Sequence, residues 1–302
     1  AGVAAALTAS ARRNLESQGS ADLAIALALG QRFRTNVFRH GGGLALAARP
    51  VRSNPPTLES LRLPTSLARL GEYANGLVLV AGPTGSGKST TVVALVEHLN
   101  RTRGKHIITL EDPVEYRYRS RRSLIHQREV GIDVPSFAIG LRAALRENPD
   151  VIVVGEMRDP ETIAAALTAA ELGHLVISTI HSRGAAWALN RIVDGMPADS
   201  RSLIAAQLAG SLRAVMTQAL LPDRSGGRVV AHELLLNNEA ISQKLREGNI
   251  HQVGTLIETN RAHGMRLLED SLAELVKRGE VAMDDALGVA SKPETLRQLI
   301  RG

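Results

Sequence analysis

The sequence contains no cysteine, which excludes a disulfide-stapled scaffold and a metal centre with thiolate ligands. It also lacks any apolar run near the length of about 20 residues that a membrane-spanning helix requires. Aromatic residues are scarce at 2%, with one Trp, three Tyr and three Phe. Proteins that bind single-stranded nucleic acids stack bases on aromatic side chains, so the sequence offers little of that chemistry.

The rest of the composition is that of a folded globular protein. Of the 302 residues, 44% are hydrophobic and 22% are charged, which excludes a wholly disordered chain. Lys and Arg number 36 against 30 Asp and Glu, so the net charge is +6. The sequence pI is about 10.1. A basic chain favours nucleic acid, an anionic membrane surface or an acidic partner, and composition alone leaves these open.

Length and proline content divide the chain into three parts. Residues 1–49 form a first segment with a thin core for an independent domain. Residues 50–64 include Pro50, Pro55 and Pro56, and we expect a linker there because consecutive prolines disfavour helices and cannot donate ladder hydrogen bonds. Residues 65–302 then form the main domain.

The main domain begins with apolar strands that alternate with helices. Short apolar or β-branched runs predict buried strands at residues 76–81, 106–110, 151–154 and 175–180. Helices are expected over 88–100 and 160–172, the second capped by Asp159 and terminated by Gly173. This alternation favours an α/β fold with a mainly parallel sheet covered on both faces. From about residue 184 the pattern is mostly helical, including an amphipathic helix within 264–279.

One segment matches the phosphate-binding pattern G-x-x-x-x-G-K-[ST] at every position. It consists of Gly82, Pro83, Thr84, Gly85, Ser86, Gly87, Lys88 and Ser89, followed by Thr90. Glycines let several backbone N–H groups converge on a triphosphate, and the helix that follows adds the positive end of its dipole. Lys88 is placed to reach the β- and γ-phosphates, and the Ser89 hydroxyl to ligate Mg²⁺. An ordinary glycine turn is the alternative, but the strand–loop–helix context favours a site for ATP or GTP.

Acidic residues follow two of the expected strands. Glu111 and Asp112 end one strand and Glu156 ends another, so they are expected at the same sheet edge as the phosphate loop. ATP hydrolysis needs a group that orients the attacking water, which we assign to Glu156, with Glu111 supporting the water or Mg²⁺. Capping of the next turn is the alternative, above all for Asp112. Gly155 stands where many phosphate-loop ATPases have an Asp, so Mg²⁺ is expected to rely on Ser89, the phosphates and water.

Two histidines flank the expected strand at 175–180. His181 follows its carboxyl end, the edge shared with Glu111 and Glu156, so it can bond to a γ-phosphate or to a catalytic carboxylate. His174 lies at the opposite end, where we expect a structural role. For each of the two, the alternative is an ordinary surface or core histidine whose hydrogen bonds are satisfied locally.

Arginines are numerous in the first segment, namely Arg32, Arg34, Arg39 and Arg49. Composition favours a solvated basic face. The alternative is an arginine supplied from outside the sheet, which would stabilise charge in the transition state of phosphoryl transfer. The sequence leaves these two interpretations open.

Taken together, the motifs resemble those of the bacterial secretion ATPases, and within them the PilT-type retraction ATPases of type IV pili. The resemblance covers about residues 30–302 and rests on motifs in the same order. These are the phosphate loop at 82–90, the acidic box at 109–116, the segment 153–159 and the histidine box at 173–181. Residues 127–130 and 141–150 are similar as well.

The resemblance implies a RecA-like P-loop ATPase domain preceded by a small PAS-like α+β domain, assembled as a hexameric ring. ATP would lie between the two domains, and its hydrolysis would power pilus retraction and twitching motility. Carried over by position, residues 82–90 bind ATP, Ser89 holds Mg²⁺ and Glu156 is the catalytic carboxylate. Glu111 and His181 assist it.

Further residues and partners follow from the same resemblance. Arg34 and Arg49 match positions where the family offers arginines to the phosphates of the nucleotide. The implied partners are other copies of the chain and the pilus platform protein of the inner membrane, with no nucleic acid. The implied location is cytoplasmic, peripheral to the inner membrane and not inserted in it.

The sequence also departs from the family's pattern. Residues 1–49 correspond to roughly half of an N-terminal domain that usually has about 100 residues, which leaves ring assembly open. In residues 240–246, Ser242 and Lys244 interrupt a retraction-linked motif, which keeps pilus extension or secretion as alternatives. The zinc-binding cysteines of the extension and type II secretion relatives are absent, which favours retraction. A nucleic-acid translocase on the same core is a further alternative, as is a regulatory relative that barely hydrolyses nucleotide.

Overall fold

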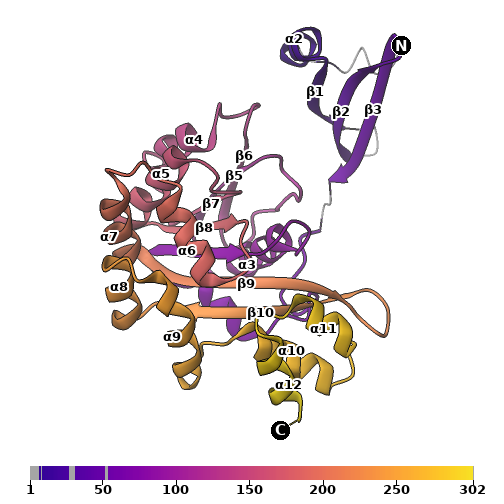
Figure 1. Cartoon of the computed structure of the whole chain (residues 1–302). Coiled ribbons are helices and arrows are strands. Elements are labelled where there is room, and N and C mark those ends of the chain that lie inside the picture. The colour runs from indigo at the N-terminus through magenta and orange to yellow at the C-terminus, as the bar shows by residue number, and fades with distance from the viewer. Residues whose placement is uncertain (1–6, 8, 27–30, 52–53, 302) are drawn as a thin grey trace. The chain divides into compact units, whose positions relative to one another are not determined.

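The structure is a computed structural model of the chain and describes residue 7 and residues 9–26, 31–51 and 54–301. The chain divides into two compact units. Unit 1 comprises Ala1–Pro55 and Pro113–Arg119, and unit 2 comprises Pro56–Asp112 and Ser120–Gly302. Figure 1 shows the helices and strands of both units.

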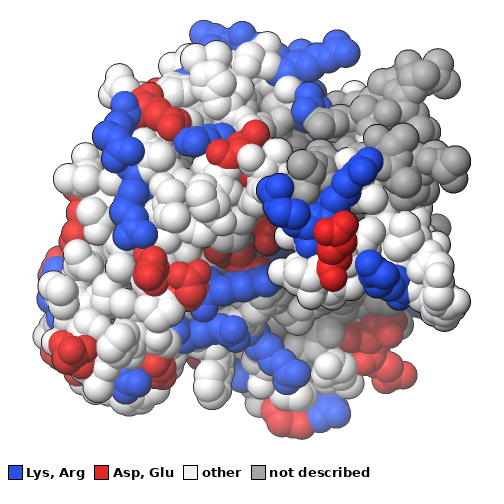
Figure 2. Space-filling model, turned by 90° about the horizontal axis from the view of Figure 1, so that it is seen from above, with Lys and Arg blue, Asp and Glu red and all other residues white. Residues whose placement is uncertain are grey.

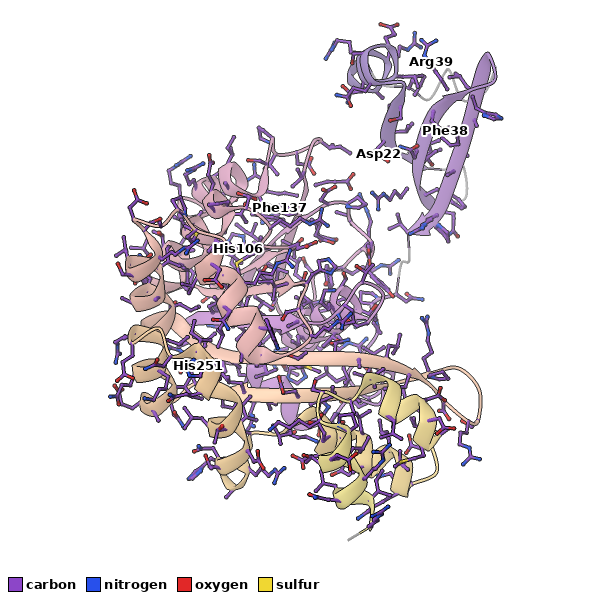
Figure 3. All side chains as sticks on the ribbon, in the orientation of Figure 1. Asp22, Phe38, Arg39, His106, Phe137 and His251 are labelled. Carbon is purple, nitrogen blue, oxygen red and sulfur yellow. The ribbon has the colours of Figure 1, made fainter. Side chains whose placement is uncertain are left out.

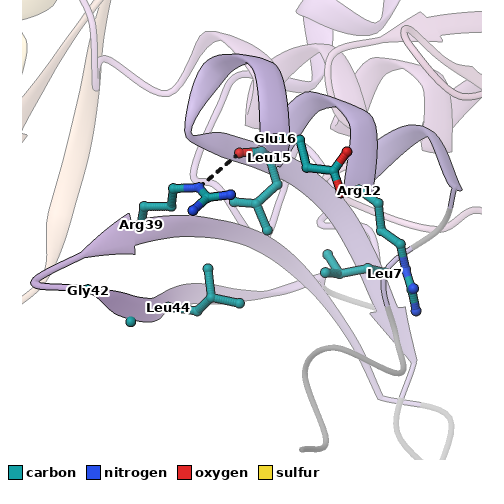
Figure 4. A pocket seen from close by; sticks show the side chains of 8 residues that line it. Leu7, Arg12, Leu15, Glu16, Arg39, Gly42 and Leu44 are labelled. Carbon is teal, nitrogen blue, oxygen red and sulfur yellow. Dashed lines mark hydrogen bonds between the residues drawn. The ribbon is translucent and has the colours of Figure 1, made fainter.

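Unit 1 is a small α+β unit, in agreement with the expectation for the first segment. Helix α2 (Ala9–Gln18) is followed by strands β1 (Ser20–Ala26), β2 (Arg32–His40) and β3 (Gly43–Val51), which pair in the antiparallel order β1-β2-β3. The helix packs its apolar side on the sheet, and the core consists of Ala11, Leu15, Ala21, Leu23 and Val37. A pocket opens between α2 and the β2–β3 hairpin (Figure 4), where Arg39 Nε donates to Leu15 O. None of the predicted site residues lines it.

The expected linker at 50–64 begins later than the prolines suggested. Pro50 and Val51 still belong to β3, where Pro50 pairs with Phe33. Because β3 pairs with β2 alone among the described strands of this sheet, its other edge needs no backbone donor, and proline is tolerated there. Residues 52 and 53 of the expected linker lie outside the described residues, and the division between the units falls after Pro55.

Unit 2 is built on a sheet of seven strands in the order β10-β9-β4-β8-β7-β5-β6. The strands are β4 (Gly76–Ala81), β5 (His106–Glu111), β6 (Leu124–Glu129), β7 (Val151–Val154), β8 (Leu175–Ile180), β9 (Leu212–Pro222) and β10 (Arg228–Leu236). All neighbouring pairs are parallel except β9 with β10. The prediction of an α/β fold with a mainly parallel, RecA-like sheet is therefore confirmed.

The helices of unit 2 connect these strands and extend past the sheet. They are α3 (Lys88–Thr102), α4 (Phe137–Ala144), α5 (Pro160–Glu171), α6 (Ala185–Asp194), α7 (Arg201–Ser211), α8 (Glu239–Arg246), α9 (Val253–Thr259), α10 (Leu268–Lys277), α11 (Met283–Val289) and α12 (Pro293–Arg301). Short 3-10 helices lie at η1 (Thr65–Gly71), η2 (Ile250–Gln252) and η3 (Arg261–His263). In the part of the chain that the structure covers, no helix has the length and apolarity to cross a bilayer.

The sheet is buried on both faces, as parallel sheets require. Successive residues of β4 point to opposite faces, so Leu77, Leu79 and Ala81 join the core shared with α4, α5, α6 and α7. Val78 and Val80 are equally buried and face the other side, where α3 contacts β4 and β8. The fully apolar pattern of β4 thus follows from cover on both faces.

The expectation of a mostly helical region after residue 184 is wrong for residues 212–236. These residues form the hairpin of β9 and β10, turned by Gly226 and Gly227, which both have positive φ. Leu, Ala, Met and Gln, which are good helix formers, dominate β9, but pairing with β4 overrides their local preference. Strand β6 was likewise not expected; it extends the sheet beside β5.

Candidate active site

The phosphate loop lies between β4 and α3, as predicted. Gly82, Gly85 and Gly87 have φ of 156°, 80° and 88°, all in the region that favours glycine. Gly87 is the N-cap of α3 and has no side-chain cap. The first N–H groups of α3 therefore remain available to an anion at the positive end of the helix.

Gly82 stands where a side chain has no room. A Cβ at this position would overlap Ser86 Oγ and would lie 2.6 Å from the backbone oxygen of Gln218. Gln218 belongs to β9, the strand beside β4, and its side-chain Nε2 donates to the Ser86 carbonyl at 2.5 Å. The loop is therefore packed against β9 and fixed to it.

Lys88 is buried within the loop that it follows. Its Nζ donates to the carbonyl oxygens of Gly82 and Pro83, both at 3.0 Å. Burial lowers the pKa of Lys88, while the nearby Glu156 carboxylate acts in the opposite direction. The ammonium is thus held inside the curve of the loop, where the predicted phosphate contact requires it. Ser89 and Thr90 follow Lys88 in the first turn of α3, and Ser89 is exposed, which leaves its hydroxyl accessible to a metal ion.

Glu156 follows the carboxyl end of β7 and is held on both of its oxygens. Oε2 lies 2.6 Å from an Arg158 guanidinium nitrogen, and Oε1 lies 3.1 Å from Nε2 of His181. The carboxylate itself is largely buried, whereas the Arg158 side chain is 70% exposed. Burial would raise the pKa of Glu156, but the hydrogen bond from Arg158 and the charges of His181, Arg158 and Lys88 lower it overall. The group is therefore ionised at neutral pH.

His181 joins this carboxylate to the phosphate loop. Its Nδ1 lies 3.3 Å from Lys88 Nζ and 3.4 Å from Thr84 Oγ1. A ring protonated on Nε2 alone donates to Glu156 and accepts from Lys88 at Nδ1. The structure therefore brings Thr84, Lys88, His181 and Glu156 together, as the sequence predicted for one sheet edge.

Glu111 ends β5, beside β7 in the sheet, and is oriented by two side chains. Thr109 Oγ1 and Gln127 Nε2 both donate to Glu111 Oε1, at 2.6 and 3.0 Å. Gln127 comes from β6, the strand that the sequence analysis did not expect. Asp112 follows directly and contributes to the raised pKa of Arg158, after the larger effect of Glu156.

Gly155, where many phosphate-loop ATPases have an Asp, is a close-packed position. A Cβ would lie 3.3 Å from the carbonyl oxygen of Leu110 and 3.4 Å from two ring atoms of Phe137. Phe137 begins α4 and is labelled in Figure 3. A Cβ at this position is therefore in tight contact, and its neighbours would have to give by a few tenths of an ångström to admit the metal-shell Asp of other ATPases.

The two ends of β8 differ as expected. His174, at the amino end, has its Nδ1 2.8 Å from Pro149 O, a contact that suits the expected structural role. Beyond His181, helix α6 begins at Ala185, whose N–H donates to Glu233 Oε1 at 2.6 Å. Burial raises the pKa of Glu233, which reaches the helix from β10. The start of α6 is thus fixed by a residue from the hairpin.

Arg34 and Arg49 both lie in unit 1 and face solvent. They are directly opposite each other on β2 and β3. Two like charges in register are unfavourable unless an anion or solvent separates them. The pair is therefore available to a negatively charged group.

Sequence reasoning missed Arg158 and Gln218 as members of the site. Arg158 stood inside a motif that was recognised, and its position two residues after Glu156 was the available signal. Gln218 carried no such signal because its strand was read as helix. The turn residues Ser225, Gly226 and Gly227 would have indicated the hairpin, but not the contact with Ser86.

Known proteins resemble this chain over most of its length. A protein of Escherichia coli strain K12, the uncharacterized protein YggR, is 50% identical over 270 residues, covering 89% of this chain and 83% of that protein. The twitching motility protein of Neisseria gonorrhoeae is 46% identical over 266 residues, covering 88% of this chain and 71% of that protein. The crystal structure of the pilus retraction motor PilT with bound ADP has a TM-score of 0.91 at 41% identity, covering 98% of this chain and 84% of that one.

The sequence model of the type II/IV secretion system protein family matches residues 61–288. This range contains the phosphate loop, both acidic strand ends and the histidine box. The resemblance inferred from motifs therefore agrees with similarity along most of unit 2. The chain belongs to the type II/IV secretion system protein family.

Proposed function

We propose that this protein is an ATPase that powers the retraction of type IV pili and hence twitching motility. One observation carries the proposal most directly: His181 bridges the phosphate-loop lysine, Lys88, and the strand-end carboxylate, Glu156. The residue that binds the triphosphate and the residue that activates water are thereby linked through one side chain. The similarity to a twitching motility protein and to a pilus retraction motor supports pilus retraction as the process that ATP hydrolysis powers.

The residues of the site divide the chemistry of hydrolysis between them. Backbone N–H groups of the loop and the Lys88 ammonium hold the β- and γ-phosphates. Ionised Glu156 accepts a hydrogen bond from the attacking water and orients it toward the γ-phosphorus. Each Glu156 oxygen has one partner, Arg158 on Oε2 and His181 on Oε1, and keeps a second lone pair that can accept from a water.

Mg²⁺ is the metal that this site suits best. The accessible Ser89 hydroxyl is an oxygen ligand, and Glu111, at the end of the strand beside β7, would support metal-bound water. Mg²⁺ keeps several of its own waters, so a site without a second carboxylate ligand is acceptable to it. When bound, the ion offsets negative charge on the phosphate oxygens.

The working form is proposed to be a homohexamer at the cytoplasmic side of the inner membrane, peripheral to it and in contact with the pilus platform protein. Arg34 and Arg49 would supply positive charge to the phosphates at a site completed by a second domain or a second copy. Their exposure and their unfavourable mutual register support a role toward an anion.

Nucleic acid is not proposed as a partner. On the face drawn in Figure 2, basic and acidic side chains lie next to one another at several places. Ion pairs of this kind include Arg142 with Glu161 and Arg128 with Glu147. Arginines that already face carboxylates are poorer contacts for a phosphate backbone.

Pilus extension is retained as a second function because of one observation in α8. Ser242, which interrupts the retraction-linked motif, is buried and donates its hydroxyl to Ala209 O at 2.8 Å. The side chain at this position therefore joins α8 to α7 and does not project outward as a basic residue would. Deletion of the gene separates the two functions, since hyperpiliated cells indicate retraction and cells without pili indicate extension.

The ATPase itself is tested with the purified chain. We expect Mg²⁺-dependent release of phosphate from ATP, and a mass measurement with and without ATP should find a hexamer. A protein that neither binds nor hydrolyses ATP would overturn the proposal. Hydrolysis by a strict monomer would retain the enzyme and overturn the ring.

A further inference from the structure

Gln218 is a buried amide that lies outside every motif used to recognise the site. It is 1% exposed and sits on β9, one residue beyond Thr217, which pairs with Ala81 at the end of β4. This register places Gln218 beside the first residue of the phosphate loop. Its backbone oxygen would lie 2.6 Å from a Cβ added at Gly82.

The side chain of Gln218 makes one polar contact with the loop. Nε2 donates to the Ser86 carbonyl oxygen at 2.5 Å, and the same nitrogen lies 3.2 Å from where a Cβ of Gly87 would be. Among the described residues, its Oε1 has no hydrogen-bond partner. Burial of an amide with only one end satisfied costs free energy compared with an apolar side chain of the same shape. An amide at this position is therefore explained by its contact with the phosphate loop and not by packing in the core.

The Ser86 carbonyl is joined to the N–H of Gly87 through a planar trans peptide. In such a peptide the C=O and the N–H point in opposite directions. A donor that fixes the Ser86 oxygen toward β9 therefore turns the Gly87 N–H away from β9. Gly87 has positive φ and caps α3, so this N–H belongs to the set that faces an anion at the helix start.

We infer that Gln218 is a positioning residue of the nucleotide site: by holding the Ser86 carbonyl it orients the Gly87 N–H toward the diphosphate of the bound nucleotide. This inference rests on the proposed ATPase function and deepens it. Because ADP and ATP share that diphosphate, Gln218 strengthens the binding of both alike. Its loss should raise the KM for ATP and leave kcat nearly unchanged.

The test uses the full chain and Gln218→Met, which keeps the length and shape of the side chain and removes its donor. A fluorescent ADP analogue serves as the binding probe, with ATPase kinetics as the second measurement. We expect the dissociation constant and the KM to rise about tenfold, the effect of one lost hydrogen bond. Tight binding by Gln218→Met, equal to that of the unmodified chain, would overturn the inference.

A matched control separates positioning from loss of stability. Leu221 lies on the same strand and is buried in the core formed with α10 and α12, away from the loop. Leu221→Ala should lower the melting temperature yet keep the ADP affinity. If Leu221→Ala weakens ADP binding as much as Gln218→Met does, the effect is general destabilisation and the inference fails.

Gln218→Glu gives a readout that a purely structural role would not move. Its carboxylate cannot donate, whereas its protonated form offers an O–H to the Ser86 carbonyl. The binding defect, measured relative to the unmodified chain at each pH, should therefore shrink from about pH 8 to about pH 5.5 because burial favours the neutral acid. A defect that is constant over this range contradicts the inference. If the unmodified chain itself binds no nucleotide, the proposed function fails instead, so the two failures are distinct.

Discussion

Replacement of Gly82 by alanine tests the packing of the phosphate loop against β9. The added Cβ would overlap Ser86 Oγ and would lie 2.6 Å from the backbone oxygen of Gln218. The Gln218 oxygen is backbone and cannot turn aside, because β9 is paired to β4, and the Ser86 Cβ lies 3.2 Å from the added atom even if the hydroxyl rotates. The φ of 156° at this position is also unfavourable for any residue with a Cβ.

The cost follows from these two effects. Backbone strain at a conformation reserved for glycine is worth about 1–3 kcal/mol, and forced overpacking about 1–3 kcal/mol. We therefore expect Gly82→Ala to cost about 3 kcal/mol or more, shared between the free energy of unfolding and the affinity for nucleotide. If the loop shifts to relieve the overlap, nearly all of that cost appears as affinity, an increase of about 100-fold in the dissociation constant for ADP.

Gly85→Ala is the matched control within the same loop. Gly85 also has positive φ, at 80°, but a Cβ there meets nothing within 4 Å. The expected cost is only the conformational one, about 1 kcal/mol. Titration with a fluorescent ADP analogue, together with thermal unfolding, measures both shares for both variants. If Gly82→Ala loses no more affinity and stability than Gly85→Ala, the close packing described for the loop is incorrect.

Three further predictions concern other parts of the chain. Arg158→Gln removes the cation beside Glu156, so the pKa of this carboxyl rises toward its ordinary value and the acid limb of the kcat–pH profile moves to higher pH. Burial, with help from the charge of Arg266, lowers the pKa of His232 from 6.5 to about 4. Below pH 6.5 the unfolded chain protonates this histidine while the folded chain keeps it neutral, so the free energy of unfolding falls by about 3 kcal/mol as pH decreases from 6.5 toward 4. Denaturant unfolding of His232→Gln should lack this decrease. Combined replacement of Arg34 and Arg49 by alanine should reduce steady-state ATPase activity and leave the melting temperature unchanged, because both side chains face solvent.

Each of these has a plain contradictory result. An acid limb that does not move in Arg158→Gln would mean that the ion pair does not tune Glu156. Equal loss of stability on acidification in His232→Gln and in the unmodified chain would assign the acid sensitivity to other groups. Full ATPase activity after replacement of both arginines would leave them as a solvated basic face, the alternative that composition favoured.

The parts of the fold that the sequence predicted share one physical cause. Strands β4, β7 and β8 are buried on both faces, so β4 and β7 appear as apolar runs with clear ends and β8 as an apolar run broken only by Ser178 and Thr179. The start of helix α5 is indicated by Asp159, whose side chain accepts from the Thr162 N–H, and by Pro160 in the first turn. Local chemistry determines these elements, and a local pattern is enough to find them.

The parts that were missed depend on contacts between distant segments. Strand β9 is rich in helix formers and becomes a strand through pairing with β4, which lies more than a hundred residues earlier. The role of Gln218 follows from that pairing and was therefore hidden with it. Arg158 was inside a recognised motif, but its ion pair with Glu156 depends on side-chain geometry, which the spacing of residues does not specify.

The most direct measurement of the proposed activity is the ATPase rate of Glu156→Gln beside that of the unmodified chain. Gln keeps the size of the side chain but removes the charge that orients water, so kcat should fall by about 100-fold or more. ADP should still bind, because the phosphate loop and Lys88 are unchanged in sequence. A variant that binds ADP and keeps most of the ATPase activity would show that Glu156 is not the catalytic carboxylate.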